Sequence, residues 1–199
     1  MDFLIVGGVA FLTSILTFFS GFGVGTILTP AFVLFFPIDI AVAMTAIVHF
    51  LNNLFKMGLT FKDINKNVLI KFGITAIPLA FLGAWLLMNF SNNNRILYEF
   101  IIADKIFTIK LVELIIGTMM LIFAIFELLP TPNKKVLKNN MLYIGGAVSG
   151  FFGGLSGHQG ALRTIFLLRS GLTKESFIAT GIAIACIVDV SRISIYFTK

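Results

Sequence analysis

The sequence contains few cysteines, which cross-link small domains, and few charged residues, which make a protein surface soluble. Its single cysteine, Cys186, excludes an internal disulfide, and no set of cysteines and histidines has the spacing of a zinc site. Charged residues make up only 12% of the chain, whereas a soluble domain carries roughly 25%. Hydrophobic residues make up 58%. This composition predicts a multi-span α-helical membrane protein.

Motifs for cofactor or nucleotide chemistry are also missing. The chain has no P-loop, no Rossmann fingerprint and no metal motif, so we expect no cofactor and no reaction driven by ATP or redox chemistry. The formal net charge of +6 would suggest a nucleic-acid partner in a soluble protein, but here the lysines flank apolar runs and indicate orientation in a membrane. Strand-sized alternating segments, the mark of a membrane barrel, are not found, and we therefore predict an all-α fold.

Apolar runs of helical length follow one another along most of the chain. The runs 38–60 and 68–90 are long enough, at about 1.5 Å per residue, to cross a hydrocarbon core of roughly 30 Å. No basic region precedes the first run, which predicts a retained span and not a cleaved signal. Thr173 is the expected N-cap of the last helix. The other expected helices are 3–20, 26–36, 110–129, 141–157, 160–171 and 175–197.

The stretch 91–109 differs from these runs because charged and amide side chains are scattered among its apolar residues. We predict a loop with an interfacial helix there. With the following span it forms a connecting segment, 91–140, between two larger parts of the chain. Tyr196, near the C-terminus of the sequence, is predicted to be an aromatic anchor at the membrane interface.

The beginning and the end of the chain resemble each other. Tyr143-Ile144-Gly145-Gly146 matches Ile5-Val6-Gly7-Gly8, Ser156-Gly157 matches Ser20-Gly21, and Ala179-Thr180 matches Met44-Thr45. Lysines cluster at 56–71 and at 133–138, and both clusters belong on the inner side of a membrane. The two halves then cross in opposite directions. We predict a single transmembrane domain, 1–199, with inverted repeats at 1–90 and 141–199 and broken, glycine-interrupted helices.

The stretch 153–163 places several glycines, a histidine, a glutamine and an arginine inside apolar sequence. Loosened backbone and polar side chains persist in lipid only where protein or a wet cavity surrounds them. We predict a break between two short helices that binds an anion through free N–H groups and the helix dipole, together with a matching break in the first half. Glycine packing between helices is the alternative, and for Arg163 so is snorkelling to the interface. The candidate substrate-binding residues are Gly23, Gly25, Asn52, Gly157, His158, Gln159, Gly160 and Arg163, with His158 and Gln159 as neutral donors.

Two further polar groups lie within predicted spans. His49, Asn52, Asn53 and Lys56 share one helical face, which indicates either a hydrated wall of a pathway, with His49 as a proton relay, or a seam of interhelical hydrogen bonds. Asp189 and Arg192 are three residues apart and can pair on one face. Structural pairing and proton coupling remain alternatives for that pair.

The residues 145–196 resemble the TauE/SafE family of sulfite-exporter-like membrane transporters. The matching residues are Gly153-Gly154-Leu155-Ser156-Gly157, Gly160, Leu172-Thr173-Lys174-Glu175 and Ala179-Thr180, with a companion pattern at Gly21–Gly25, Pro30, Ala41 and Thr45. The resemblance implies an inverted-repeat exporter of small sulfur-containing or organic anions that does not hydrolyse ATP. Many relatives carry glycines in place of His158-Gln159, and relatives continue for further spans, so the second repeat is expected to be incomplete.

The function predicted from these features is secondary transport of a small anion such as sulfite or an organosulfonate, outward across the cell membrane, by a multi-pass protein that is not an enzyme. Its partners would be the anion and the lipid bilayer, with a homo-oligomer as an option. A truncated or non-transporting membrane subunit is the first alternative. An intramembrane serine hydrolase is the second, because Gly154-Leu155-Ser156-Gly157 fits a nucleophile motif, although the one histidine nearby is only two residues from Ser156.

Overall fold

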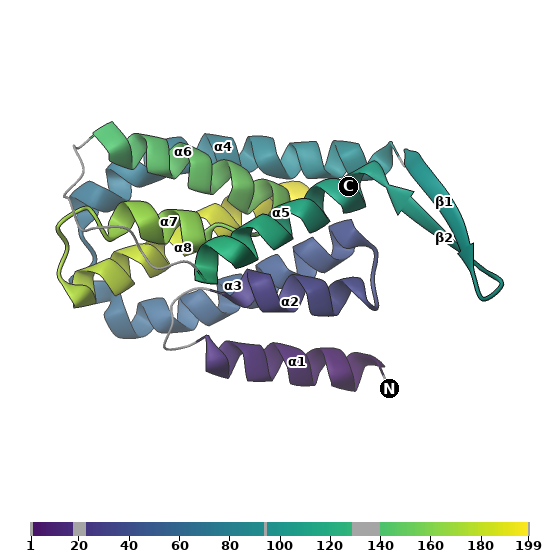
Figure 1. Cartoon of the computed structure of the whole chain (residues 1–199). Helices are drawn as coiled ribbons and strands as arrows, with labels where there is room; N and C mark the ends of the chain where they lie inside the picture. Colours follow the sequence, from purple (N-terminus) through teal and green to yellow (C-terminus); the bar gives the residue numbers. More distant parts are fainter. Residues whose placement is uncertain (1, 18–22, 94, 129–139, 199) are drawn as a thin grey trace.

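The computed structural model describes residues 2–17, 23–93, 95–128 and 140–198, and within them eight α helices form a bundle that carries a two-stranded hairpin at one end (Figure 1). A short 3-10 turn, Phe61–Asp63, links two of the long helices. The helices are α1 (Asp2–Leu16), α2 (Val24–Val33), α3 (Ile38–Thr60), α4 (Lys66–Asn92), α5 (Leu111–Leu128), α6 (Asn140–Ser156), α7 (Gly160–Leu167) and α8 (Lys174–Tyr196); the strands are β1 (Ile96–Ile102) and β2 (Lys105–Lys110).

The helices lie close to where the apolar runs predict them. Helix α3 has the predicted bounds, and α4 begins two residues earlier than predicted because the Asn65 side chain accepts a hydrogen bond of 3.0 Å from the Val68 N–H. Thr173 caps α8 as predicted, with its hydroxyl oxygen 3.2 Å from the Ser176 nitrogen. Polar capping residues thus mark the helix starts that hydropathy alone leaves uncertain.

Among the described residues, three segments are long and apolar enough to cross a membrane: Ile38–Asp63, Lys66–Asn92 and Lys174–Tyr196. Shorter apolar helices accompany them at Val6–Leu16, Val24–Val33 and Leu111–Phe126. The chain is therefore a mostly helical membrane protein.

The prediction for 91–109 is wrong. This segment forms an antiparallel hairpin, in which Phe100 pairs with Phe107 and their rings stack 5.5 Å apart. The turn residues Ala103 and Asp104 have φ of 48° and 61°, the left-handed conformation that a two-residue hairpin loop requires. Isoleucines and aromatic residues of high β propensity flank this turn. They favour a pair of strands, whereas the scattered charges had been interpreted as those of an interfacial helix. The fold is thus mostly helical but not all-α.

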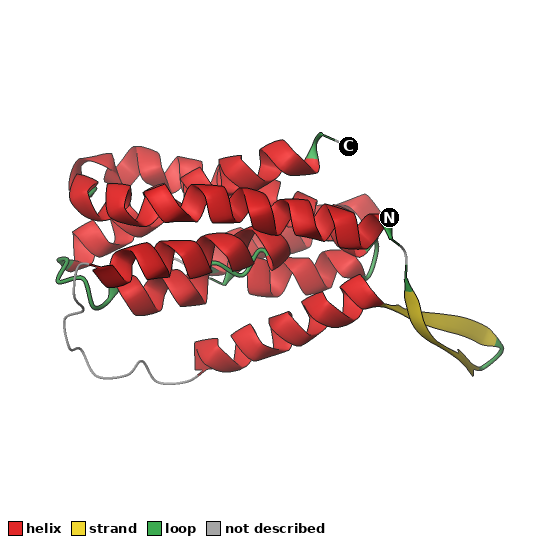
Figure 2. Cartoon of the chain, turned by 90° about the horizontal axis from the view of Figure 1, so that it is seen from above, coloured by secondary structure: helices red, strands yellow, loops and turns green. Residues whose placement is uncertain are grey.

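The first and last helices of the chain point in opposite directions (Figure 1). Helices α1 and α3 run away from the hairpin end of the bundle, whereas α6 and α8 run toward it. The link between α3 and α4 lies at the far end from the hairpin, and Figure 2 shows the hairpin projecting beyond the helices from a second side. The lysine-bearing link around 61–67 is therefore separated from the hairpin by the length of the bundle.

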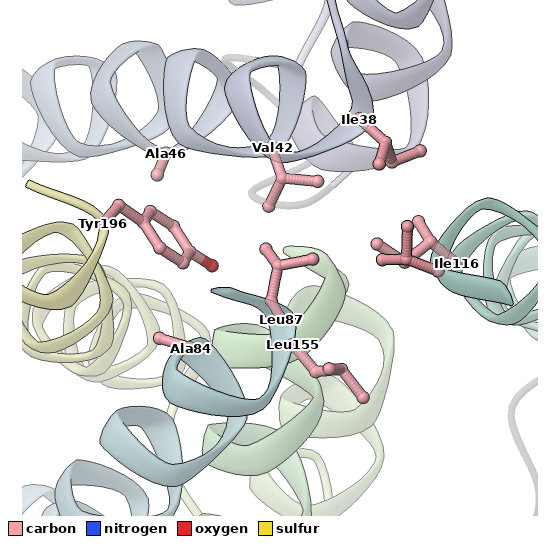
Figure 3. Close-up of a cluster of buried hydrophobic side chains, with 9 residues drawn as sticks. Ile38, Val42, Ala46, Ala84, Leu87, Ile116, Leu155 and Tyr196 are labelled. Carbon is pink, nitrogen blue, oxygen red and sulfur yellow. The ribbon is translucent and has the colours of Figure 1, made fainter. Parts of the chain in front are cut away.

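A cluster of buried apolar side chains joins α3, α4, α5, α6 and α8 (Figure 3). Val42 from α3 and Leu87 from α4 face each other at its centre, with Tyr196 beside them and Ile116 approaching from α5. A second cluster, around Phe72 and Ile184, joins α4 and α6 to α7 and α8. The hydrophobic interior thus surrounds α8 and the end of α6.

Helices α4 and α6 pack with their backbones in close approach. A Cβ on Gly146, Gly150 or Gly154 would lie 2.1, 2.2 and 2.1 Å from the carbonyl oxygens of Phe72, Ala76 and Ala80. Small residues four apart permit this approach between helices in a membrane, where dispersion contacts drive association. Part of the glycine content of 145–157 therefore serves helix packing, the alternative that the sequence left open.

Candidate functional site

The break predicted in the second half lies between α6 and α7. Helix α6 ends at Ser156, α7 begins at Gly160, and Gly157 between them has a φ of 83°, a left-handed conformation that favours glycine. Ser156, His158, Gln159 and Arg163 are all buried. The polar side chains at the break therefore face protein and not lipid.

A glycine of the first half touches this break. A Cβ on Gly25 would lie 2.9 Å from the carbonyl oxygen of Gly157, so the start of α2 meets the turn between α6 and α7. Gly23, which precedes α2, has a φ of 95°. Residues 20–22, which belong to the break predicted in the first half, lie outside the described residues.

Asp189 on α8 is the centre of a buried hydrogen-bond network. Its Oδ1 atom accepts from Arg192, at 2.7 Å from Nη2 and 3.0 Å from Nε, and from Gln159 Nε2 at 3.0 Å. Its Oδ2 atom lies 2.6 Å from His49 Nδ1 on α3. The Asp189–Arg192 pair is placed as its spacing predicts, and it also joins the break to α3.

Arg163 is reached from this network through Gln159. Its Nη1 atom lies 3.4 Å from Gln159 Oε1, and the arginine is 3% exposed, so it does not snorkel to an interface. Lys56 is also buried, and its Nζ donates to the Thr17 carbonyl at 3.1 Å. The buried charged residues in the described part of the chain are thus three cations, Lys56, Arg163 and Arg192, and one carboxylate, Asp189.

Two residues of α8 hold the C-terminal end of α6. Arg192 Nη1 donates to the Gly153 carbonyl at 3.2 Å, and the Tyr196 hydroxyl donates to the Gly154 carbonyl. Carbonyls in the last turn of a helix are short of intrahelical donors. Helix α8 supplies a donor to the Gly154 carbonyl and a second donor to the Gly153 carbonyl, which also accepts from the Gly157 N–H at 3.0 Å. Tyr196 is 7% exposed and is therefore not the interface anchor that we predicted. Its position four residues after Arg192, on the same helical face, was the signal that could have indicated this role.

Asn52 does not join the network. Its amide donates to the Ser14 carbonyl at 3.4 Å, and it lines a mostly apolar groove of about 450 Å³ between α1 and α3. His49 and Asn53 on the same helix are buried, and the Asn53 amide donates back to the His49 carbonyl at 2.9 Å. The polar face predicted on 38–60 is thus divided: His49 reaches the α8 network, whereas Asn52 faces α1.

Ser156 and His158 are in contact, with 3.3 Å between Ser156 Oγ and His158 Nδ1. The serine hydroxyl, however, donates its proton to the Phe152 carbonyl at 3.0 Å. A serine nucleophile needs a base that accepts that proton, and here the hydroxyl directs it elsewhere. The His158 ring stacks on Phe123 of α5, with centroids 5.7 Å apart and an interplanar angle of 11°. This contact was not expected from the sequence, because nothing local relates α5 to the break.

The chain matches one family model, described as sulfite exporter TauE/SafE, over residues 6–199. No curated protein and no solved structure matches the chain. The family match spans both the Gly23–Gly25 segment and the break at 157–160, so it covers every residue of the network around Asp189.

Proposed function

Since the chain belongs to the sulfite exporter TauE/SafE family, we propose that it is a secondary transporter that exports a small anion, such as sulfite or an organosulfonate, across the cell membrane. Members of this family are transporters and not enzymes, which leaves no place for the serine hydrolase alternative. The proposal makes the chain a multi-pass protein in which the shorter apolar helices accompany the three long ones.

The excess of positive charge in the buried interior carries the proposal. Three cations and one carboxylate are buried among the described residues, and the carboxylate already binds Arg192 and His49. Buried charges in membrane proteins are paired or mark a substrate pathway. An anion beside Arg163 would bring the charge of this region closer to balance.

The anion would be held at the contact between the two halves. The first N–H groups of α7 lack intrahelical partners and lie at the positive end of the helix dipole, and Arg163 is in the first turn of that helix. A guanidinium presents paired donors that match sulfonate, sulfite and carboxylate oxygens. Gly25 would line the same cradle from α2, because it touches the Gly157 carbonyl.

Inverted repeats would supply the transport cycle. The opposite directions of the first and last helices support this interpretation (Figure 1). In transporters built from such repeats, one half moves against the other around a site formed by broken helices near the middle of the membrane. The His49–Asp189 contact joins α3 to α8, and we propose that a proton held there is coupled to the movement of the anion.

Transport by purified protein in liposomes tests the anion site. We expect Arg163→Lys to lower the rate of sulfite or organosulfonate efflux by about tenfold, because the planar pair of donors is lost while the charge remains. Arg169→Lys, after the end of α7, is the matched control and should transport normally. Equal rates for the parent and Arg163→Lys would refute the site, and a parent that moves none of these anions would refute the function.

Cysteine labelling tests the orientation. Asn65→Cys lies in the α3–α4 link and Asp104→Cys in the hairpin turn, and the native Cys186 is buried. We expect an impermeant reagent applied outside intact cells to label only the hairpin cysteine, because lysines mark the inner side. Labelling at Asn65 alone or at both sites contradicts the proposed orientation. The second lysine cluster, at 133–138, lies outside the described residues.

A further inference from the structure

The hydrogen bonds around His158 determine which of its ring nitrogens carries a proton. The Ser156 hydroxyl has one proton and donates it to the Phe152 carbonyl, so toward His158 it can only accept. The contact of 3.3 Å is therefore a donation from His158 Nδ1 to Ser156 Oγ. A neutral imidazole has one donor and one acceptor, and a neutral ring suits an interior that already holds three buried cations. Nε2 is then the acceptor.

This acceptor is buried and has no hydrogen-bond partner among the described residues. The His158 side chain as a whole is 4% exposed. A buried polar atom without a partner is destabilising by roughly 1–3 kcal/mol, and such atoms are rare in folded proteins. The atom lies on the residue next to Gln159 at the break between α6 and α7, where the proposed anion would bind.

We propose that the site selects an oxyanion that carries its own proton, and that the O–H of this anion donates to His158 Nε2. This inference rests on the proposed anion transport and specifies the protonation state of the substrate. The charged oxygens of the anion would face Arg163 and the N–H groups of α7, which are donors, whereas His158 recognises the remaining O–H. Of the sulfur oxyanions, singly protonated sulfite has this chemistry, and a fully deprotonated oxyanion does not.

The assignment reverses the role expected for His158 from the sequence. As a donor it would favour any anion of suitable size. As an acceptor it places its lone pair opposite the lone pair of a fully deprotonated oxygen, which leaves two buried acceptors without a donor. Sites built to bind a substrate hydroxyl through a hydrogen bond reject analogues that lack it far more strongly than apolar pockets reject a missing methylene.

Methylphosphonate and methanesulfonate test the proposal as a matched pair. At mildly acidic pH both carry one negative charge and have nearly the same shape, but only the phosphonate keeps an O–H. We expect the purified protein to bind methylphosphonate at least about tenfold more tightly than methanesulfonate, measured by ligand-dependent thermal stabilisation or calorimetry. This factor corresponds to the cost of leaving one buried acceptor without a donor.

Two His158 variants separate the ring nitrogens. An asparagine amide can replace Nδ1 and still donate to Ser156, but it has no atom at the position of Nε2. A glutamine amide reaches that position and can offer its oxygen. We therefore expect His158→Asn to lose the preference, with weaker binding of methylphosphonate and tighter binding of methanesulfonate than in the parent, because the lone pair that opposes a deprotonated oxygen is gone. We expect His158→Gln to recover part of the preference for methylphosphonate.

The outcomes distinguish this inference from the proposed function. Equal binding of both anions by the parent, with loss of both in Arg163→Gln, would leave the anion site intact and overturn the role of His158. Tighter binding of methanesulfonate than of methylphosphonate would make His158 a donor and also overturn it. No binding of either anion by the parent would overturn the site itself. A preference in the parent that persists in His158→Asn would assign the O–H to another residue.

Discussion

The two halves of the molecule share a backbone plan and differ in chemistry. In each, a glycine of positive φ precedes a short helix, Gly23 at 95° before α2 and Gly157 at 83° before α7, and a 23-residue helix follows. Helix α2 contains no ionisable side chain, whereas α7 carries Arg163 beside His158 and Gln159. The long helices meet at the centre of the hydrogen-bond network, because α3 supplies His49 and α8 supplies Asp189. Neither half contains the complete network.

The second half of the chain is also more deeply buried than the first. Within an 18-residue apolar stretch of α8, 67% is buried inside the structure. The corresponding value for the segment Ile38–Asp63, which contains α3, is 39%. Large apolar side chains of α1, such as Phe11 and Leu16, are exposed, whereas the glycines of α6 pack directly against the backbone of α4. Equivalent positions in the two halves should therefore respond unequally to substitution, and paired variants can measure this.

The largest difference is expected between Asp189→Asn and Lys56→Met. Removing the Asp189 charge leaves Arg192 and the His49 contact without a carboxylate, which should lower the free energy of unfolding by about 3–5 kcal/mol. Replacing Lys56 by an apolar side chain of similar length removes a donor to the Thr17 carbonyl, which should lower the free energy of unfolding by only about 1 kcal/mol. Thermal unfolding in detergent measures both variants.

The double variant Asp189→Asn, Arg192→Gln sharpens this test. It removes both members of the pair, so we expect a smaller loss of folded yield than for Asp189→Asn alone. An equal or greater loss in the double variant would show that the pair is not what stabilises α8. Equal losses in Asp189→Asn and Lys56→Met would instead show that the two halves depend equally on their buried charges.

An intermediate difference is expected between Gly146→Ala and Gly8→Ala, two positions that match in the repeat predicted from the sequence. A Cβ on Gly146 would lie 2.1 Å from the Phe72 carbonyl oxygen, and a Cβ on Gly8 would meet nothing within 4 Å. We expect Gly146→Ala to destabilise by about 1–3 kcal/mol through forced separation of α4 and α6. Gly8→Ala should be neutral or stabilising by up to about 1 kcal/mol. The unfolding midpoints of the two purified variants decide the matter, and destabilisation of similar size in both would contradict the unequal packing.

The smallest difference is expected between Thr180→Val and Thr45→Val, a second matching pair. The Thr180 hydroxyl accepts from the Asn65 backbone N–H at 2.9 Å, and a backbone donor cannot rotate to another partner. Thr180→Val should therefore lose about 1 kcal/mol. The Thr45 hydroxyl accepts from the Thr29 hydroxyl at 3.3 Å. Because the Thr29 hydroxyl can turn to a carbonyl of its own helix, Thr45→Val should lower the free energy of unfolding by less than Thr180→Val does. Hydrogen exchange at Asn65 is a direct readout, and unchanged exchange in Thr180→Val would refute the contact.

The sequence predicted most of the helices and the location of the break, because both depend on local properties. Apolar runs between polar caps define α3 and α8 within a few residues. Polar side chains cannot stay unpaired in lipid, and for that reason the stretch 153–163 stood out in the sequence. The Asp189–Arg192 pair follows from a three-residue spacing on one helix. The hairpin was missed although its residues favour strands, because its charges were interpreted as those of a helix at a membrane surface.

Local patterns in the sequence are therefore enough to assign the membrane class, the order of the helices and the polar residues that need partners. The partners that these residues find depend on how the helices pack. His49 and Asp189 are 140 residues apart, and no periodicity relates them; α3 and α8 bring them to 2.6 Å because both pack in the interior of the bundle. The same packing turns Asn52 toward α1, directs Tyr196 to the end of α6 and stacks Phe123 on His158. Periodicity determines which face of a helix is polar, but the approach of neighbouring helices determines what each residue on that face contacts.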